Sequence, residues 1–72
     1  MQSYRDINHD SNVEAYSIGP DYIEVKFKGT ARIYRYSYRS AGREHVEQMK
    51  ILAERGDGLN SYIMRHVKYS YE

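Results

Sequence analysis

Residues 22–39 read YIEVKFKGTARIYRYSYR, and this stretch decides the fold. Apolar or aromatic residues alternate with other residues on both sides of Gly29-Thr30, a period of two that is typical of β-strands. Gly29 suits a tight turn because glycine adopts positive φ without strain. The stretch therefore predicts a β-hairpin with strands over residues 22–28 and 32–39.

A two-residue loop at Gly29-Thr30 fixes the register of this hairpin. Val25 then pairs with Tyr34, and Ile23 pairs with Tyr36, so that the tyrosines share a face with the apolar residues of the first strand. We expect Tyr34, Tyr36 and Tyr38 to be core rings beneath the helices, because aromatic strand residues usually pack. Exposed rings that stack on bases are the alternative.

The chain before the hairpin supplies one more strand. Val13, Tyr16 and Ile18 indicate a strand whose irregular spacing suggests a bulge. Residues 1–10 are polar and are expected to be loose unless another segment ties them down, so that the domain spans residues 11–72.

The period changes to that of a helix after Ser40, which is a plausible N-cap. Gly56-Asp57-Gly58 ends this helix, and Asn60 then caps a second, shorter one. The residues expected to face inward from the two helices are Val46, Met49, Leu52, Ala53, Tyr62, Ile63, Val67 and Tyr69. The predicted fold class is α+β: a three-stranded antiparallel meander with two C-terminal helices packed on one face, in the order β-β-β-α-α.

The composition limits how this fold is stabilised. The chain has 72 residues, enough for one domain, and no cysteine, so neither a disulfide nor a thiolate metal site is available. It has nine tyrosines but only two leucines, so several tyrosines must be buried. We expect a cytoplasmic protein, because no apolar run approaches the ~18 residues that cross a bilayer and no export leader is visible.

The charge is strongly partitioned along the chain. Residues 1–24 carry a net charge of −4, residues 25–43 one of +6, and residues 44–72 one of −1. We expect four of the basic residues, Lys26, Lys28, Arg35 and Arg39, on the sheet face away from the helices. With Arg32, Arg43 and Tyr22 as a stacking ring, they are the candidate nucleic-acid-binding residues. A solvated face that blocks edge-to-edge strand pairing is the alternative.

No pattern in the sequence indicates catalysis. His9, His45 and His66 do not have the spacing of metal ligands, and the short Gly-Asp-Gly segment lacks the lysine of a phosphate-binding loop. A domain of this size also has little room for a closed pocket. We therefore expect a protein that is not an enzyme and that uses no metal, cofactor or small-molecule substrate.

A set of residues between Ser11 and about Tyr69 has the order and spacing of a known domain family: Ser11-Asn12-Val13, Ile23, Val25, Phe27, Gly29, Tyr34-Arg35-Tyr36, Ala53, Gly56, Leu59-Asn60 and Ile63. Together these residues resemble the KTSC domain. That family is named after a segment at the C-terminus of some lysyl-tRNA synthetases and also occurs as small proteins of bacteria and phages. The chain departs from the family at Tyr38-Arg39-Ser40-Ala41, where the family has Val-Pro. The resemblance implies the fold and a family motif at Tyr34 and Tyr36; the family's function is unknown, with RNA binding proposed from the synthetase association.

Two functions follow as hypotheses. The first is a binding module for RNA, including tRNA, that contacts phosphates through the basic sheet face. The second is a protein-interaction module, for example a phage or mobile-element accessory protein that binds a host complex or a second copy of itself.

Overall fold

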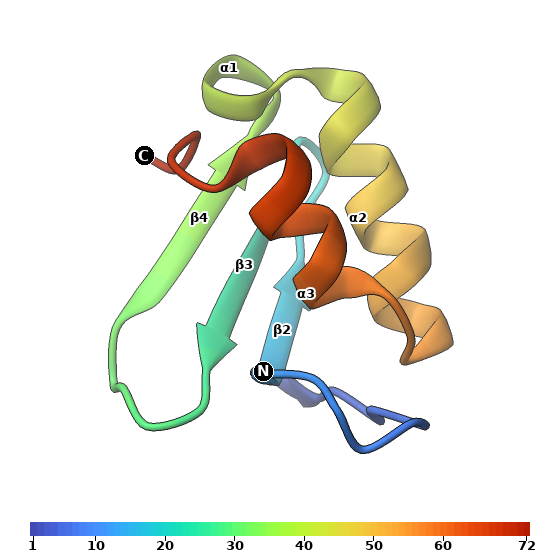
Figure 1. Cartoon of the computed structure of the whole chain (residues 1–72). Helices are drawn as coiled ribbons and strands as arrows, with labels where there is room; N and C mark the ends of the chain where they lie inside the picture. The colour runs from blue at the N-terminus through green and yellow to red at the C-terminus, as the bar shows by residue number, and fades with distance from the viewer.

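A four-stranded antiparallel sheet carries the helices on one of its faces (Figure 1). The computed structural model describes residues 1–72. The strands are β1 (Gln2–Ser3), β2 (Val13–Ile18), β3 (Tyr22–Phe27) and β4 (Ile33–Ser37), and they lie in the order β1-β2-β3-β4. The α+β class is confirmed, whereas the prediction of three strands is wrong because β1 adds a fourth.

The predicted register of the central hairpin is confirmed. Val25 pairs with Tyr34, and Ile23 pairs with Tyr36. The two-residue turn is wrong: residues 28–32 form a longer loop, in which the N–H of Arg32 donates to Oγ1 of Thr30 over 3.1 Å. The register survives because the alternation of apolar and polar faces determines it and the loop length does not.

The bulge in β2 is confirmed as well. The register shifts between Val13 and Ala15, so that Val13 lies opposite Phe27 and Tyr16 lies opposite Val25. The extra residue turns Val13 and Tyr16 to the same face although they are three positions apart. Both are buried in the core.

The N-terminal segment is tied down, and the domain therefore begins before residue 11. Gln2 pairs with Tyr16 of β2, and the Tyr4 side chain is only 6 % exposed. The hydroxyl of Tyr4 accepts a hydrogen bond from the N–H of Leu59 over 3.3 Å. A buried ring with a satisfied hydroxyl holds this segment against the helices.

Asp6 closes the loop that follows Tyr4. Its carboxylate accepts hydrogen bonds from the N–H groups of Asp10 and Ser11 and forms a salt bridge with Lys28. Burial opposes ionisation of this carboxyl, but the N–H of Ser11, the ammonium of Lys28 and the N–H of Asp10 outweigh it. The pKa of Asp6 therefore lies below its usual value.

The first predicted helix begins earlier than expected and is divided into two helices, and the second contains a π-helical turn. The elements are α1 (Tyr38–Ala41), α2 (Arg43–Arg55), α3 (Leu59–Tyr62) and the π-helical turn η1 (Ile63–Val67). Gly42, at φ 95°, separates α1 from α2. Ser37 caps α1 by accepting from the N–H of Ser40, so the predicted cap at Ser40 is wrong. Asn60 is not a cap either, because α3 begins at Leu59 after Gly58.

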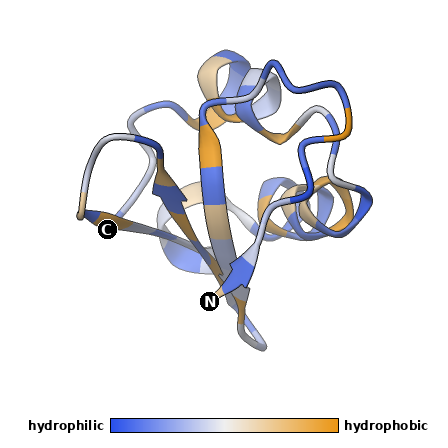
Figure 2. Ribbon diagram, turned by 90° about the horizontal axis from the view of Figure 1, so that it is seen from below, coloured by the Kyte–Doolittle hydropathy of each residue, from blue (hydrophilic) through white to orange (hydrophobic).

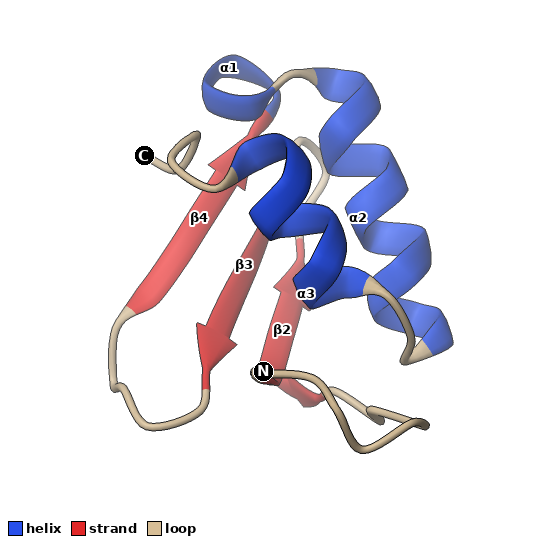
Figure 3. Cartoon of the chain, viewed as in Figure 1, coloured by secondary structure: helices blue, strands red, loops and turns tan.

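The helices α2 and α3 lie over the same face of the sheet (Figure 3). The predicted inward residues that are fully buried are Val46, Met49, Ala53, Ile63 and Val67, whereas Leu52 and Tyr62 are half-buried. Tyr69 is 78 % exposed, and its predicted inward position is wrong because η1 ends at Val67. None of the helices is long and apolar enough to cross a membrane.

The hairpin tyrosines occupy different depths. Tyr36 is 1 % exposed, in the core as the register predicted, and Tyr34 is half-buried against the core. Tyr38 lies in α1 instead of the strand, where its hydroxyl donates to Glu47 over 2.6 Å. The colours along the strands in Figure 2 change between hydrophobic and hydrophilic, as expected for a sheet with one covered and one open face.

Candidate nucleic-acid interface

The open face of the sheet carries paired charges. Nζ of Lys26 lies 2.9 Å from Oε2 of Glu14, across β2 and β3. Arg35 donates two hydrogen bonds to Oε2 of Glu24, over 3.1 Å from Nε and 2.9 Å from Nη2, and these bonds raise the pKa of Arg35. The Arg35 guanidinium also lies 4.1 Å from the ring centroid of Tyr22. Glutamates thus balance both basic residues of this face, and Arg35 covers Tyr22.

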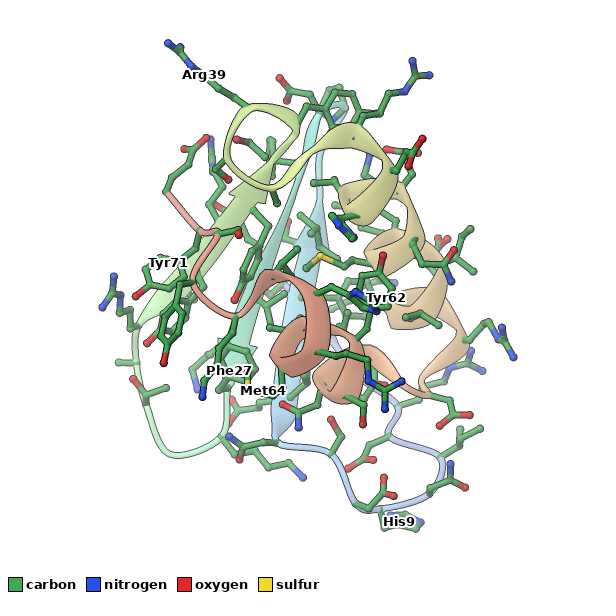
Figure 4. The ribbon with its side chains drawn as sticks, turned by 45° about the horizontal axis from the view of Figure 1, so that its top comes forward. His9, Phe27, Arg39, Tyr62, Met64 and Tyr71 are labelled. Atoms are coloured by element: carbon green, nitrogen blue, oxygen red, sulfur yellow. The ribbon has the colours of Figure 1, made fainter.

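Lys28 and Arg39 do not share this face, contrary to the prediction. Since β3 ends at Phe27, Lys28 lies in the loop, and its Nζ is 3.3 Å from Oδ2 of Asp6. Arg39 lies in α1, because the chain turns into a helix after Ser37. In Figure 4, Arg39 projects away from the body of the molecule.

Arg32 and Arg43 lie against aromatic rings. The Cζ atom of Arg32 is 4.6 Å from the ring centroid of Tyr34 and 5.1 Å from that of Tyr71. Cζ of Arg43 is 5.9 Å from the ring centroid of Tyr38. Neither arginine forms a salt bridge, so both keep an unneutralised charge. Of the six candidate cations, three are ion-paired and three, counting Arg39, are not.

A groove of about 350 Å³ lies between the end of the hairpin and the segment that follows η1. We call it the aromatic groove. Its ten lining residues are Asn12, Phe27, Lys28, Thr30, Tyr34, Tyr36, Met64, Lys68, Tyr69 and Tyr71. Figure 4 shows Phe27 and Met64 near one another and Tyr71 on the side of β4. Six of the lining side chains are apolar or aromatic, two are lysines and none is acidic.

The rings of the aromatic groove hold one another edge to face. The centroid of Tyr34 is 5.5 Å from that of Phe27 and 4.8 Å from that of Tyr71, with the ring planes at 75° and 88°. Tyr71 also packs against Tyr36 at 6.2 Å. Such T-shaped contacts are favourable aromatic geometry and fix the ring positions. Burial, with smaller effects from Tyr34 and Tyr71, raises the pKa of Tyr36 to about 12, so its phenol is neutral at pH 7.

The sequence did not single out Lys68 or Tyr71 as site residues. They reach the groove because the last residues return to β4, where the N–H of Glu72 donates to the carbonyl of Arg35 over 2.8 Å. No local sequence pattern predicts this contact. The only signal was composition, a lysine and two tyrosines within residues 68–71.

Two of the three histidines lie next to each other, and the third lies in the N-terminal loop. His45 and His66 come together across α2 and η1 with ring centroids 5.5 Å apart, and Nδ1 of His45 lies 2.7 Å from the hydroxyl oxygen of Tyr62. His9 lies at the tip of the N-terminal loop (Figure 4). The structure contains no group of three or more metal-ligating side chains.

Comparisons with known proteins add no relative to this description. No family model matches the chain, and neither a curated protein nor a solved structure matches it. The resemblance to the KTSC domain therefore stays a prediction.

Proposed function

We propose that this protein is a small non-enzymatic module that binds single-stranded RNA at the aromatic groove. The observation that carries the proposal is a groove with five aromatic side chains, two lysines and no carboxylate in its lining, with Arg32 beside it. Proteins that bind single strands combine aromatic rings, on which bases stack, with cations that contact the phosphates.

The position of the unpaired charges favours this groove over the open sheet face. Lys26 and Arg35 form salt bridges with Glu14 and Glu24. Arg32 and Lys68 form no salt bridge. Lys28 pairs with Asp6, but its side chain is 52 % exposed and remains accessible. We therefore assign the main phosphate contacts to Lys28, Arg32 and Lys68, and outlying contacts to Arg39 and Arg43.

The resemblance to the KTSC domain agrees with this proposal. Its central motif falls on Tyr34 and Tyr36, and both line the aromatic groove. A cytoplasmic protein of a bacterium or phage, with tRNA among the candidate ligands, is the biological setting that the resemblance suggests.

A protein-interaction module is the second candidate. β4 is an edge strand of the sheet, and Ile33 at its start is exposed, as in strands that pair with a partner. The hydrogen bond from Glu72 to Arg35 already occupies part of this edge. Recovery of one protein partner without nucleic acid would favour this second candidate.

The test is a titration of a labelled single-stranded RNA oligonucleotide, read by fluorescence anisotropy at two salt concentrations. We expect affinity to fall roughly tenfold for a fourfold rise in salt, as for two or three phosphate contacts. The double variant Arg32→Gln, Lys68→Gln should lose most of the affinity. Lys26→Gln on the open face is the matched control and should retain it. Absence of binding at low salt would refute the proposal.

A further inference from the structure

The geometry points to a single-nucleotide site: the aromatic groove takes one unpaired base among its tyrosines and the adjoining phosphate between Lys28 and Lys68. This inference rests on the proposed function and specifies how it is carried out. It names the ligand chemistry, a planar base joined to a phosphate. The nucleotide could belong to an RNA strand or be free, and the experiment below separates these sources.

Tyr69 is the main indication that the groove can take a planar ligand. Its ring is 78 % exposed although it lies in the lining, and its one close charged neighbour is Nζ of Lys68, 5.4 Å from the ring centroid. The exposed ring of Tyr69 offers an apolar face beside the aromatic cluster, and burial of that face would be favourable. A base stacked on this ring would remove its face from water.

The ring of Tyr34 is held in place by its neighbours. Tyr34 is held by Phe27 and Tyr71, and the Arg32 guanidinium lies over both tyrosines. A wall fixed on three sides loses little conformational freedom when a ligand arrives, which favours affinity. Tyr69 with its exposed ring and Tyr34 with its fixed ring therefore offer two surfaces in one lining for a planar ligand.

The charges of the groove suit one phosphate. Lys28 comes from the hairpin loop and Lys68 from the residue after η1, so two lysines from separate segments line the same groove. The nearest acidic group in contact with either is Asp6, which the N–H groups of Asp10 and Ser11 also engage. Lys28 can turn from Asp6 to a phosphate without leaving that carboxylate unpaired.

The size of the groove limits the ligand to a small one. Its volume of about 350 Å³ is near the lower end of ordinary ligand pockets. A stacked duplex presents base edges and not base faces, so it cannot place a ring among these tyrosines. The site therefore discriminates unpaired from paired nucleotides.

The experiment is a heteronuclear NMR titration of the full chain with four probes: adenosine monophosphate, adenosine, ribose 5-phosphate and a single-stranded oligoadenylate. We expect the resonances of Tyr34, Met64 and Tyr69 to shift with the monophosphate and the oligonucleotide, and to shift much less with the probes that lack the phosphate or the base. Tyr69→Ala should weaken oligonucleotide binding roughly tenfold, the effect of losing one base–aromatic stack. Tyr22→Ala, which removes a ring from the open face, is the matched control and should leave affinity unchanged.

The outcomes separate this inference from the proposed function. Oligonucleotide binding that shifts the groove resonances but that Tyr69→Ala leaves intact overturns the inference and leaves the proposed function standing. Oligonucleotide binding without shifts in the groove overturns both. Groove shifts with the monophosphate and no binding of the oligonucleotide support the site, with a free nucleotide as its ligand, and overturn the proposed function. Groove shifts with both probes, tighter for the oligonucleotide, support both. No response to any probe overturns both.

Discussion

Tyr36 is the residue whose chemistry the fold changes most. Its ring is 1 % exposed between the sheet and the helices, and its pKa is raised to about 12 because a phenolate there would lose its hydration. The same residue lies at the floor of the aromatic groove. Folding thus depends on this phenol keeping its proton.

Stability is expected to fall as the pH rises from 10.0 to about 12. The unfolded chain ionises Tyr36 near pH 10.0, whereas the folded chain resists ionisation until about pH 12. A raised pKa in the folded state gives stability that is complete below pH 10.0 and is lost above it. A shift of this size corresponds to a loss of about 2–3 kcal/mol in the free energy of unfolding. Urea unfolding followed by circular dichroism at a series of alkaline pH values measures it.

The variant Tyr36→Phe tests the assignment to this residue. Phenylalanine cannot ionise, so the decline between pH 10.0 and about 12 should become smaller. Part of it should remain, since the pKa values of Tyr4 and Tyr62 are raised as well, chiefly by burial. Tyr69→Phe, at an exposed ring, is the control and should follow the parent curve. A Tyr36→Phe curve parallel to the parent curve would contradict the assignment.

For the strands and helices, the alternation of apolar and polar residues predicted the structure better than the candidate capping residues did. The register of β3 and β4 could be predicted because one pairing places Ile23 and Val25 on the same face as Tyr34 and Tyr36. The helix caps could not be predicted. Ser37 and Ser40 are both serines, and the sequence alone does not show at which of them the helix begins. β1 was not predictable either: two polar residues have no period, and the signal for this segment was the single Tyr4.

The close approach of the N-terminal segment to the end of α2 gives a prediction about two glycines. Gly29 and Gly56 have nearly the same φ, 82° and 74°. A Cβ at Gly29 would meet no atom within 4 Å, whereas one at Gly56 would lie 2.7 Å from Cβ of Arg5. Gly29→Ala should therefore cost about 1 kcal/mol of backbone strain. Gly56→Ala should cost about 1–3 kcal/mol more, because Arg5 must move. Thermal or urea unfolding measures both.

A double-mutant cycle isolates the contact with Arg5. In an Arg5→Gly background the clashing Cβ is absent, so Gly56→Ala should then cost little more than Gly29→Ala does. An extra cost at Gly56 that is the same in both backgrounds would show that the N-terminal segment does not pack as described.

In the folded molecule, the acidic and basic segments of the sequence contact each other through salt bridges. The acidic first third folds against the basic hairpin through Asp6 with Lys28, Glu14 with Lys26 and Glu24 with Arg35. The hairpin register already places Glu24 opposite Arg35, but the pairing of Lys28 with Asp6 could not be predicted, because it depends on the path of the N-terminal segment. The aromatic groove was not predictable for the same reason. Its lining comes from Asn12, the hairpin and residues 64–71, which only the tertiary fold brings together.

This pairing predicts that the open face can be converted into a phosphate-binding surface. The double variant Glu14→Gln, Glu24→Gln leaves Lys26 and Arg35 without their carboxylates, on a face that no helix covers. RNA affinity at low salt should rise severalfold, and its salt dependence should steepen by about one to two phosphate contacts. Stability should change by less than ~1 kcal/mol per pair, because exposed salt bridges contribute little.

The matched control separates local charge from total charge. Glu44→Gln with Glu54→Gln changes the net charge by the same amount, but both residues lie on α2 and neither forms a salt bridge. We expect the control to raise affinity much less than the open-face variant. Equal gains would mean that only net charge matters. No gain in the open-face variant would contradict the prediction that its unpaired cations bind phosphate.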